Sequence, residues 1–173
     1  MISLLMCGGK GKRLNVGEKP LFEVCGMKLV DHSLKALKKY KIIAITSPFT
    51  PRTEKYLRDK GYEVYRAKGA GFVEDYRECI NSLSLKGPLL IVSSDIVYLR
   101  DGIIDEVVDF YRNCGKIALK VIKDGQPVGI NIVIAEIDGE QEEESYIVED
   151  VININTLDDA KRAEQLWTSM RKG

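Results

Sequence analysis

A short glycine-rich loop follows the first apolar run of the chain and carries residue types that could bind phosphate. It reads Cys7-Gly8-Gly9-Lys10-Gly11-Lys12-Arg13-Leu14. The glycines let backbone N–H groups approach an anion without a Cβ in the way, and the basic side chains add positive charge beside them. We therefore expect Gly8, Gly9, Lys10, Gly11 and Lys12 to bind a phosphate chain. The alternative is a tight strand-to-helix turn whose basic side chains are merely solvated.

Two commoner phosphate-binding motifs do not fit this loop. A Walker A loop needs Ser or Thr after its Gly-Lys pair and a glycine five residues before that pair, but Arg13 and Met6 stand there. A dinucleotide-binding fingerprint starting at Gly9 would need its third glycine where Leu14 stands. The sequence therefore predicts a phosphate loop of another class.

Charge and composition limit the partners. The chain has 173 residues, which fits one domain over residues 1–173. Lys and Arg number 26, as do Asp and Glu, so the formal net charge is zero. Duplex nucleic-acid binders are usually basic, so we expect no nucleic-acid partner, and any anion site must be local.

The cysteines and the single histidine exclude other classes of site. Cys7, Cys25, Cys79 and Cys114 form neither a CxxC pair nor a zinc spacing. A lone His32 excludes a multi-histidine metal centre and argues against Ser-His-Asp catalysis. The chain shows no signal peptide and no apolar run of membrane-spanning length. We expect free thiols and a cytoplasmic location.

Alternating apolar runs and amphipathic segments must position the loop. We expect strands at Ile2–Met6, Ile42–Thr46, Glu63–Arg66, Pro88–Ser93, Lys116–Ile122 and Val128–Ala135, and an extended segment at Tyr146–Ile152. We expect helices at Leu29–Lys39, Arg52–Lys60, Val73–Leu83, Ile103–Tyr111 and Leu157–Met170, the last capped by Thr156. The acidic stretch at 138–144 is expected to be an exposed loop or hairpin tip.

This alternation predicts an α/β fold with α/β/α layers around a mainly parallel, mixed sheet that is Rossmann-like. Ligands of such sheets bind outside the carboxyl ends of the strands. The loops to examine are therefore those after the strands ending near Met6, Thr46, Arg66 and Ser93.

Further segments complete a family resemblance. Glu18-Lys19-Pro20-Leu21 follows the loop, Gly26-Met27-Lys28-Leu29-Val30 leads into a helix, Ser94-Asp95 ends a strand, and Asn153-Ile154-Asn155-Thr156-Leu157-Asp158-Asp159 opens the last helix. Together with the GGxGxR loop these segments resemble the nucleotidyltransferase family with the nucleotide-diphospho-sugar transferase fold. The resemblance covers nearly the whole chain, with its motifs in the family's order.

The resemblance implies roles for several residues. It makes Arg13 and Lys19 stabilisers of charge on the transferring and leaving phosphates, and Asp95 a ligand of Mg²⁺, with Asn153 and Asn155 as further metal ligands. It places ribose and base at Gly69 and Gly71, and it adds Gly129 and Asn131 to the binding residues.

Each role has a structural alternative. Arg13 could pair with Glu18, Lys19 could be solvated, and Asp95 could cap a turn. Asn153 and Asn155 could be turn and cap residues. Gly129 could allow a bulge, and the glycines at 69 and 71 could form a plain flexible loop.

Short members of the family transfer GMP from GTP to a phosphorylated cofactor precursor. The segments Gly69-Ala70-Gly71-Phe72-Val73-Glu74-Asp75 and Pro127–Asn131 are more similar to the archaeal group that acts on adenosylcobinamide phosphate than to the molybdenum cofactor guanylyltransferases. The chain departs from the family pattern at Cys7, Lys12, Asn153, Asn155 and Leu157. A molybdenum cofactor guanylyltransferase, another NTP transferase and a non-catalytic nucleotide-binding regulator stay open, as does a homodimer.

Overall fold

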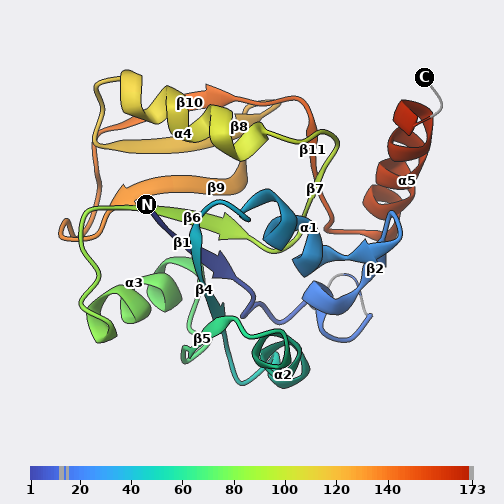
Figure 1. Cartoon of the computed structure of the whole chain (residues 1–173), viewed down its shortest axis with the longest axis horizontal. Coiled ribbons are helices and arrows are strands. Elements are labelled where there is room, and N and C mark those ends of the chain that lie inside the picture. Colours follow the sequence, from blue (N-terminus) through green and yellow to red (C-terminus); the bar gives the residue numbers. More distant parts are fainter. Residues whose placement is uncertain (12–13, 15, 172–173) are drawn as a thin grey trace.

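The computed structural model describes residues 1–11, 14 and 16–171, and it is built around one central sheet (Figure 1). In spatial order the sheet contains β10 (Glu143–Ile147), β8 (Ala118–Lys123), β9 (Gln126–Ile134), β6 (Pro88–Ser93), β1 (Ile2–Met6), β4 (Lys41–Thr46) and β5 (Glu63–Arg66). Strands β6, β1, β4 and β5 run parallel, β9 is antiparallel to both of its neighbours, and β10 is parallel to β8. The expected mainly parallel, mixed sheet is confirmed.

Successive residues of the central strands serve two different cores. Leu5 and Cys7 belong to one cluster, with side chains of α1 (Leu29–Ala36), α2 (Pro51–Asp59) and α4 (Ile103–Asn113). Leu4 and Met6 belong to the other, with side chains of α3 (Phe72–Ser82). Side chains alternate across a strand, so continuous apolar runs bury both faces of the sheet. The expected α/β/α layering is therefore confirmed.

A smaller unit lies beside the main sheet, at the end of the molecule where α5 stands in Figure 1. It contains η1 (Lys19–Leu21), β2 (Glu23–Val24), β3 (Met27–Lys28), β7 (Ile96–Tyr98), β11 (Val151–Asn153) and α5 (Leu157–Arg171). Strand β2 pairs with β3, and β7 pairs with β11, both antiparallel. A third core, which includes Val24, Ile152 and Ala163, holds these pieces together.

Several element boundaries shift by one or two residues from the sequence-based expectation, and two differences are larger. The extended segment expected at Tyr146–Ile152 is two strands, β10 and β11, that belong to different sheets. The first helix ends at Ala36 rather than Lys39, because the backbone N–H of Tyr40 bonds to the carbonyl of Leu37 in a tighter turn. The acidic stretch at 138–144 is mostly exposed, but its last residues open β10.

Cys7 and Cys79 are buried free thiols. Over the described ranges, the structure has no helix that is both long and apolar enough to cross a membrane.

Candidate active site

The glycine loop leaves β1 at the carboxyl edge of the sheet, as expected. A Cβ on Gly8 would lie 3.1 Å from Cβ of Ser47, while nothing lies within 4 Å of the Cβ position of Gly9. Gly11 has φ +58 and packs against Lys19, whose Cβ would lie 3.3 Å from a Cβ at position 11. Gly8 and Gly11 thus have steric reasons to be glycine, whereas the backbone at Gly9 is open to a ligand. Lys12 and Arg13 lie outside the described residues.

Glu18 attaches the segment after the loop to the N-terminus of α2. Its Oε1 accepts a hydrogen bond from the backbone N–H of Arg52 (2.9 Å). Its Oε2 accepts from the backbone N–H of Thr53 (2.6 Å) and from Thr53 Oγ1 (2.7 Å). A carboxylate is well placed there, because the first N–H groups of a helix have no partner within the helix. The adjacent Lys19 is therefore anchored on one side.

Lys19 reaches across the cavity to two residues distant in sequence. Its Nζ donates to Asp95 Oδ2 (2.6 Å) and to Asn155 Oδ1 (3.0 Å). The side chains of Lys19 and Asp95 are only 16% and 20% exposed. Lys19 is thus held by ion pairing rather than merely solvated.

The carboxylate of Asp95 is held from behind. Ser93 Oγ donates to its Oδ1 (2.6 Å), and Asn153 Nδ2 lies 3.5 Å from the same oxygen. Asn153 Nδ2 also donates to the carbonyl of Val128 (2.9 Å). The Asn153 amide nitrogen therefore faces Asp95, and as a metal ligand Asn153 stays a prediction.

The pairing of β7 with β11 brings residues 95 and 153–155 together. Asn153 lies opposite Ile96 in this pair, and the backbone N–H of Ile154 donates to the carbonyl of Asp95 (2.8 Å). Next along the chain, Thr156 Oγ1 accepts from the backbone N–H of Asp159, whose carboxylate accepts in return from the backbone N–H of Thr156. This reciprocal capping box confirms Thr156 as the cap of α5.

A cavity of about 340 Å³ contains most of the predicted catalytic and phosphate-binding residues. Its lining consists of Cys7, Gly9, Lys10, Gly11, Leu14, Lys19, Pro20, Ser94, Asp95 and Asn155. Burial raises the pKa of the Cys7 thiol to about 12, so this cysteine is protonated and is no nucleophile at neutral pH. Among the described residues, the cavity thus offers backbone N–H groups, the ammonium groups of Lys10 and Lys19 and the carboxylate of Asp95.

The predicted base and ribose loop lies next to this cavity. Oδ1 of the buried Asp75 accepts from the backbone N–H groups of Gly69 and Ala70 (both 3.0 Å). Gly69 has φ +76, and a Cβ there would lie 2.7 Å from Cε2 of Phe49. At Gly71 a Cβ would meet the carboxylate of Glu74 at 2.1 Å. These contacts give the loop at residues 69–71 a defined backbone conformation. Its contact with a nucleotide stays a prediction.

A second, larger cavity of about 800 Å³ contains three further predicted residues. Gly129, Asn131 and Asn153 line it together with side chains of α3 and β8 that the sequence did not single out. Gly129 has φ +79 within a stretch of irregular β8–β9 register, so the bulge foreseen as its structural alternative is present. Among the residues that sequence reasoning missed are Arg77 of α3 and Lys120 of β8, which come from separate elements and share no motif.

The oxygen atoms near Lys19 fit a small divalent cation. Asp95 Oδ2 and Asn155 Oδ1 already face one cation, the ammonium of Lys19. Carboxylate and amide oxygens are ligands that Mg²⁺ accepts, usually with phosphate oxygens and water completing the shell. In the described ranges no cluster of three or more His, Cys, Asp or Glu could hold a metal. The residues therefore suit a cation whose other ligands come from a nucleotide.

Comparison with known proteins agrees with this geometry. Residues 3–143 match the family model of the MobA-like NTP transferase domain. The chain is 37% identical to the "Adenosylcobinamide-phosphate guanylyltransferase" of Methanocaldococcus jannaschii, over 96% of this chain and 97% of that protein. It is 30% identical to the "Probable molybdenum cofactor guanylyltransferase" of Pyrococcus horikoshii, over 68% of this chain and 60% of that protein.

A solved structure supports the fold. The molybdopterin-guanine dinucleotide biosynthesis protein A of Archaeoglobus fulgidus superposes with a TM-score of 0.76 at 20% identity, covering 98% of this chain and 100% of that one. At this identity the likeness bears on the fold alone, while the family match extends over most of the chain. The protein is therefore a member of the MobA-like NTP transferase domain family.

Proposed function

We propose that the protein is a guanylyltransferase that transfers GMP from GTP to adenosylcobinamide phosphate and releases pyrophosphate. The observation that carries this proposal is the convergence of Lys19, Asp95 and Asn155 on the cavity beside the glycine loop. The acceptor is suggested by the near full-length similarity to a protein named for that activity. A location in the cytoplasm is part of the proposal.

The reaction asks little of side chains as acids or bases. A phosphate monoester has a second pKa near 6 and is therefore largely a dianion at neutral pH. One of its oxygens attacks the α-phosphorus of GTP, the bond from that phosphorus to the bridging oxygen breaks, and pyrophosphate leaves with the electron pair. No proton transfer is needed, so none of the residues in the described cavity lining has to act as a general base. Catalysis then depends on alignment and charge stabilisation.

Different residues of the first cavity have different roles in binding and charge stabilisation under this proposal. The backbone N–H groups at Gly9 and Gly11 and the ammonium of Lys10 bind the triphosphate. The ammonium of Lys19 stabilises the negative charge that builds up on the transferring and leaving phosphates. Asp95 and Asn155 would hold Mg²⁺, which when bound supplies charge neutralisation at the α-phosphate. Arg13 has the same proposed role as Lys19 from the sequence alone.

The second cavity is our proposed place for the acceptor. Asn153 lines this cavity and contacts Asp95, which lines the first cavity. An acceptor phosphate reaching past Gly129 and Asn131 would arrive at the carboxyl end of β6, where Asp95 begins the next loop. At about 800 Å³ this cavity falls in the size range of pockets for sizeable small molecules.

The test has two stages. Melting temperatures are first compared with GTP, ATP, CTP and UTP in the presence of Mg²⁺. A ligand at a hundred times its Kd adds about 2.7 kcal/mol to stability, so we expect a clear shift that is largest for GTP. Equal shifts with GTP and ATP would remove the guanine assignment.

Pyrophosphate release is then measured with GTP and candidate acceptors. We expect release with adenosylcobinamide phosphate. Release only with molybdopterin would favour the molybdenum cofactor activity. The similarity to the Pyrococcus protein, which covers less of both chains, supports that alternative. GTP binding without release with any acceptor would favour a nucleotide-binding regulator.

A further inference from the structure

One exposed aromatic ring stands beside the phosphate loop. Phe49 follows β4 and precedes α2, and 43% of its surface is exposed. Large apolar side chains on loops at the carboxyl edge of a parallel sheet lie where ligands of such sheets bind. The ring is thus an aromatic surface within reach of the same site, and no role has yet been assigned to it.

Backbone contacts rather than burial fix the position of this ring. The backbone N–H of Phe49 donates to Ser47 Oγ (3.1 Å), and Ser47 Oγ donates to the carbonyl of Gly8 (2.6 Å). The hydroxyl of Ser47 therefore links the phosphate loop to the loop that carries the ring. A nucleotide bound at Gly8 and Gly9 would have Phe49 at a set distance.

The ring also explains a glycine in the neighbouring loop. A Cβ on Gly69 would lie 2.7 Å from Cε2 and 3.0 Å from Cδ2 of Phe49, closer than such atoms approach. The left-handed backbone of Gly69, at φ +76, adds a second reason for glycine. Gly69 and Phe49 are thus fitted to each other, and the ring backs onto the loop at 69–71.

A cation from the phosphate loop covers the ring. Lys10 Nζ lies 4.5 Å from the ring centroid, a cation–π contact. Such a contact at an exposed site is weak, on the order of 1 kcal/mol, whereas an ammonium binds phosphate strongly. A triphosphate in the loop would draw Lys10 away and expose the ring face to the base of the same nucleotide.

We propose that Phe49 is the stacking platform for the base of the bound nucleoside triphosphate. This inference rests on the proposed function and extends it, because it names the residue that binds the base. Every base has a π face, so the platform adds affinity for a purine without choosing guanine over adenine. The choice of base then belongs to polar groups around the ring, such as the backbone of residues 69–71.

The test separates base binding from phosphate binding. Calorimetric titrations compare GTP with inorganic tripolyphosphate, which has no base, on the wild type and on Phe49→Leu. Base–aromatic stacking contributes enough that we expect roughly tenfold weaker GTP binding by Phe49→Leu. Tripolyphosphate affinity should be unchanged. The matched control is Phe110→Leu, since Phe110 is 36% exposed on α4 and packs against Tyr146 away from both cavities.

A second variant guards against a misfolded loop. Phe49→Trp keeps an aromatic face, so it should retain GTP affinity, and its added fluorescence should be quenched by GTP but not by tripolyphosphate. Equal GTP affinity of Phe49→Leu and wild type would overturn the stacking proposal for Phe49 but leave the proposed function standing. So would equal losses of GTP and tripolyphosphate affinity in Phe49→Leu. Absence of GTP binding by the wild type would instead overturn the proposed function together with this inference.

Discussion

The loops at the carboxyl ends of β1, β4 and β5 differ in chemistry from the surface formed by α3, β8 and β9. The loops are rich in glycine and expose backbone, and contacts with Ser47, Lys19 and Phe49 account for glycine at positions 8, 11 and 69. The other surface is lined by side chains, among them Phe72, Arg77, Lys120 and Glu143, around a cavity more than twice as large. One region has the form of a phosphate and nucleotide site, and the other that of a site for a larger molecule.

This difference has a consequence for sequence reading. Backbone recognition needs glycines in one short stretch, so it leaves a motif. Recognition by side chains uses single residues from several elements, so it leaves no motif in the sequence. The phosphate loop was therefore visible in the sequence as a motif, while Arg77 and Lys120, which line the second cavity, come together only in three dimensions. Variants in each region can test whether the two regions also differ in function. A variant of Asp95 can test whether this residue is needed at the junction between them.

The largest effect is expected at the junction of the two regions. Asp95→Asn removes the carboxylate that pairs with Lys19 and is proposed to bind Mg²⁺, while it keeps the side-chain shape and an acceptor for Ser93. We expect turnover to fall by roughly 10² to 10³, as when a pre-organised charge is removed, with the melting temperature little changed. Steady-state pyrophosphate release is the measurement. Asp150→Asn, which breaks only a surface pair with Arg100, is the control. Near-normal release would make Asp95 a structural residue.

A slightly smaller loss is expected from the nucleotide region. Lys19→Ala should lower kcat by roughly 10², because charge stabilisation felt in the transition state is lost. Arg13→Ala should cost at least as much, since a guanidinium can bridge two phosphate oxygens. Lys39→Ala, which removes a surface pair with Asp105, serves as control. If folded Lys19→Ala instead raised only KM for GTP, its role would be binding alone.

A glycine of the acceptor region tests whether backbone constraints are confined to the loops. Gly129 has φ +79, and a Cβ there would lie 2.8 Å from Cβ of Ser93. Gly129→Ala should therefore lose about 2 kcal/mol of unfolding free energy through strain and crowding behind Asp95. Gly125→Ala separates these causes, because Gly125 has φ +73 with no atom within 4 Å of its Cβ position. Equal losses in urea titrations would show that crowding at Ser93 contributes nothing.

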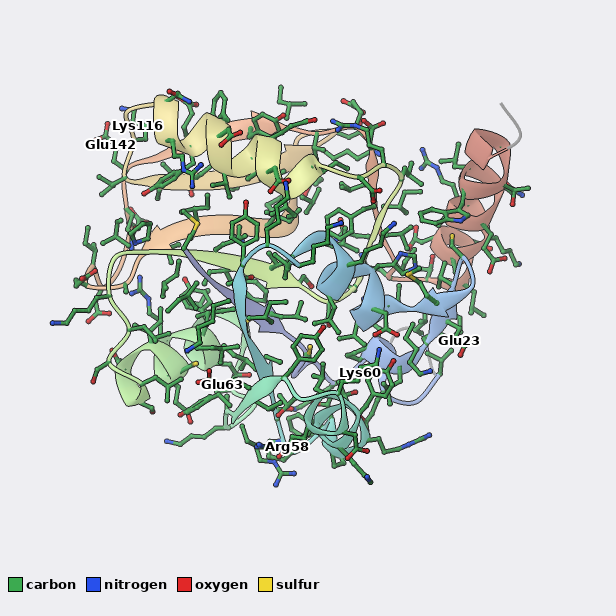
Figure 2. All side chains as sticks on the ribbon, in the orientation of Figure 1. Glu23, Arg58, Lys60, Glu63, Lys116 and Glu142 are labelled. Atoms are coloured by element: carbon green, nitrogen blue, oxygen red, sulfur yellow. The ribbon has the colours of Figure 1, made fainter. Side chains whose placement is uncertain are left out.

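The smallest effect concerns acceptor binding. Lys120 lines the second cavity and pairs with Glu143 of β10. Lys120→Met should raise KM for the acceptor about fivefold, as expected for one lost polar contact, and leave KM for GTP unchanged. Lys116→Met is a matched control, because Lys116 forms the same kind of pair with Glu142 but lies outside the cavity; Figure 2 shows Lys116 and Glu142 together at the outer edge of the sheet. Identical kinetics for both variants would place the acceptor elsewhere.

Much of the fold and the nucleotide side of the site could be predicted from the sequence. The main strands and helices follow from apolar periodicity, and Lys19, Asp95 and Asn155, separated by up to 136 positions, do converge. What periodicity could not show is β7 and β11, since strands of three residues are too short to have a period. Yet their pairing is what joins residues 95 and 153–155.

Phe49, and the contact of Glu18 with α2, were missed for a related reason. Their contacts are with residues distant in sequence, Gly69 and Lys10 for Phe49 and the N-terminus of α2 for Glu18, and such contacts leave no local pattern in the sequence. Lys12 and Arg13, which were also predicted from the sequence, lie outside the described residues.

The ion pair between Lys19 and Asp95 also affects the electrostatic interaction between the ligand-free cavity and an incoming phosphate. An unpaired carboxylate at its base would repel every phosphate that enters, but the chain supplies its own counter-ion, and the charges of the pair sum to zero. Incoming phosphates compete with Asp95 for that ammonium. Under the proposed function, a divalent cation arriving alone would find the position between Asp95 and Asn155 occupied by the ammonium, whereas one chelated by the triphosphate would arrive as the ammonium is drawn away. The salt bridge would thereby favour joint entry of nucleotide and metal over entry of the metal first.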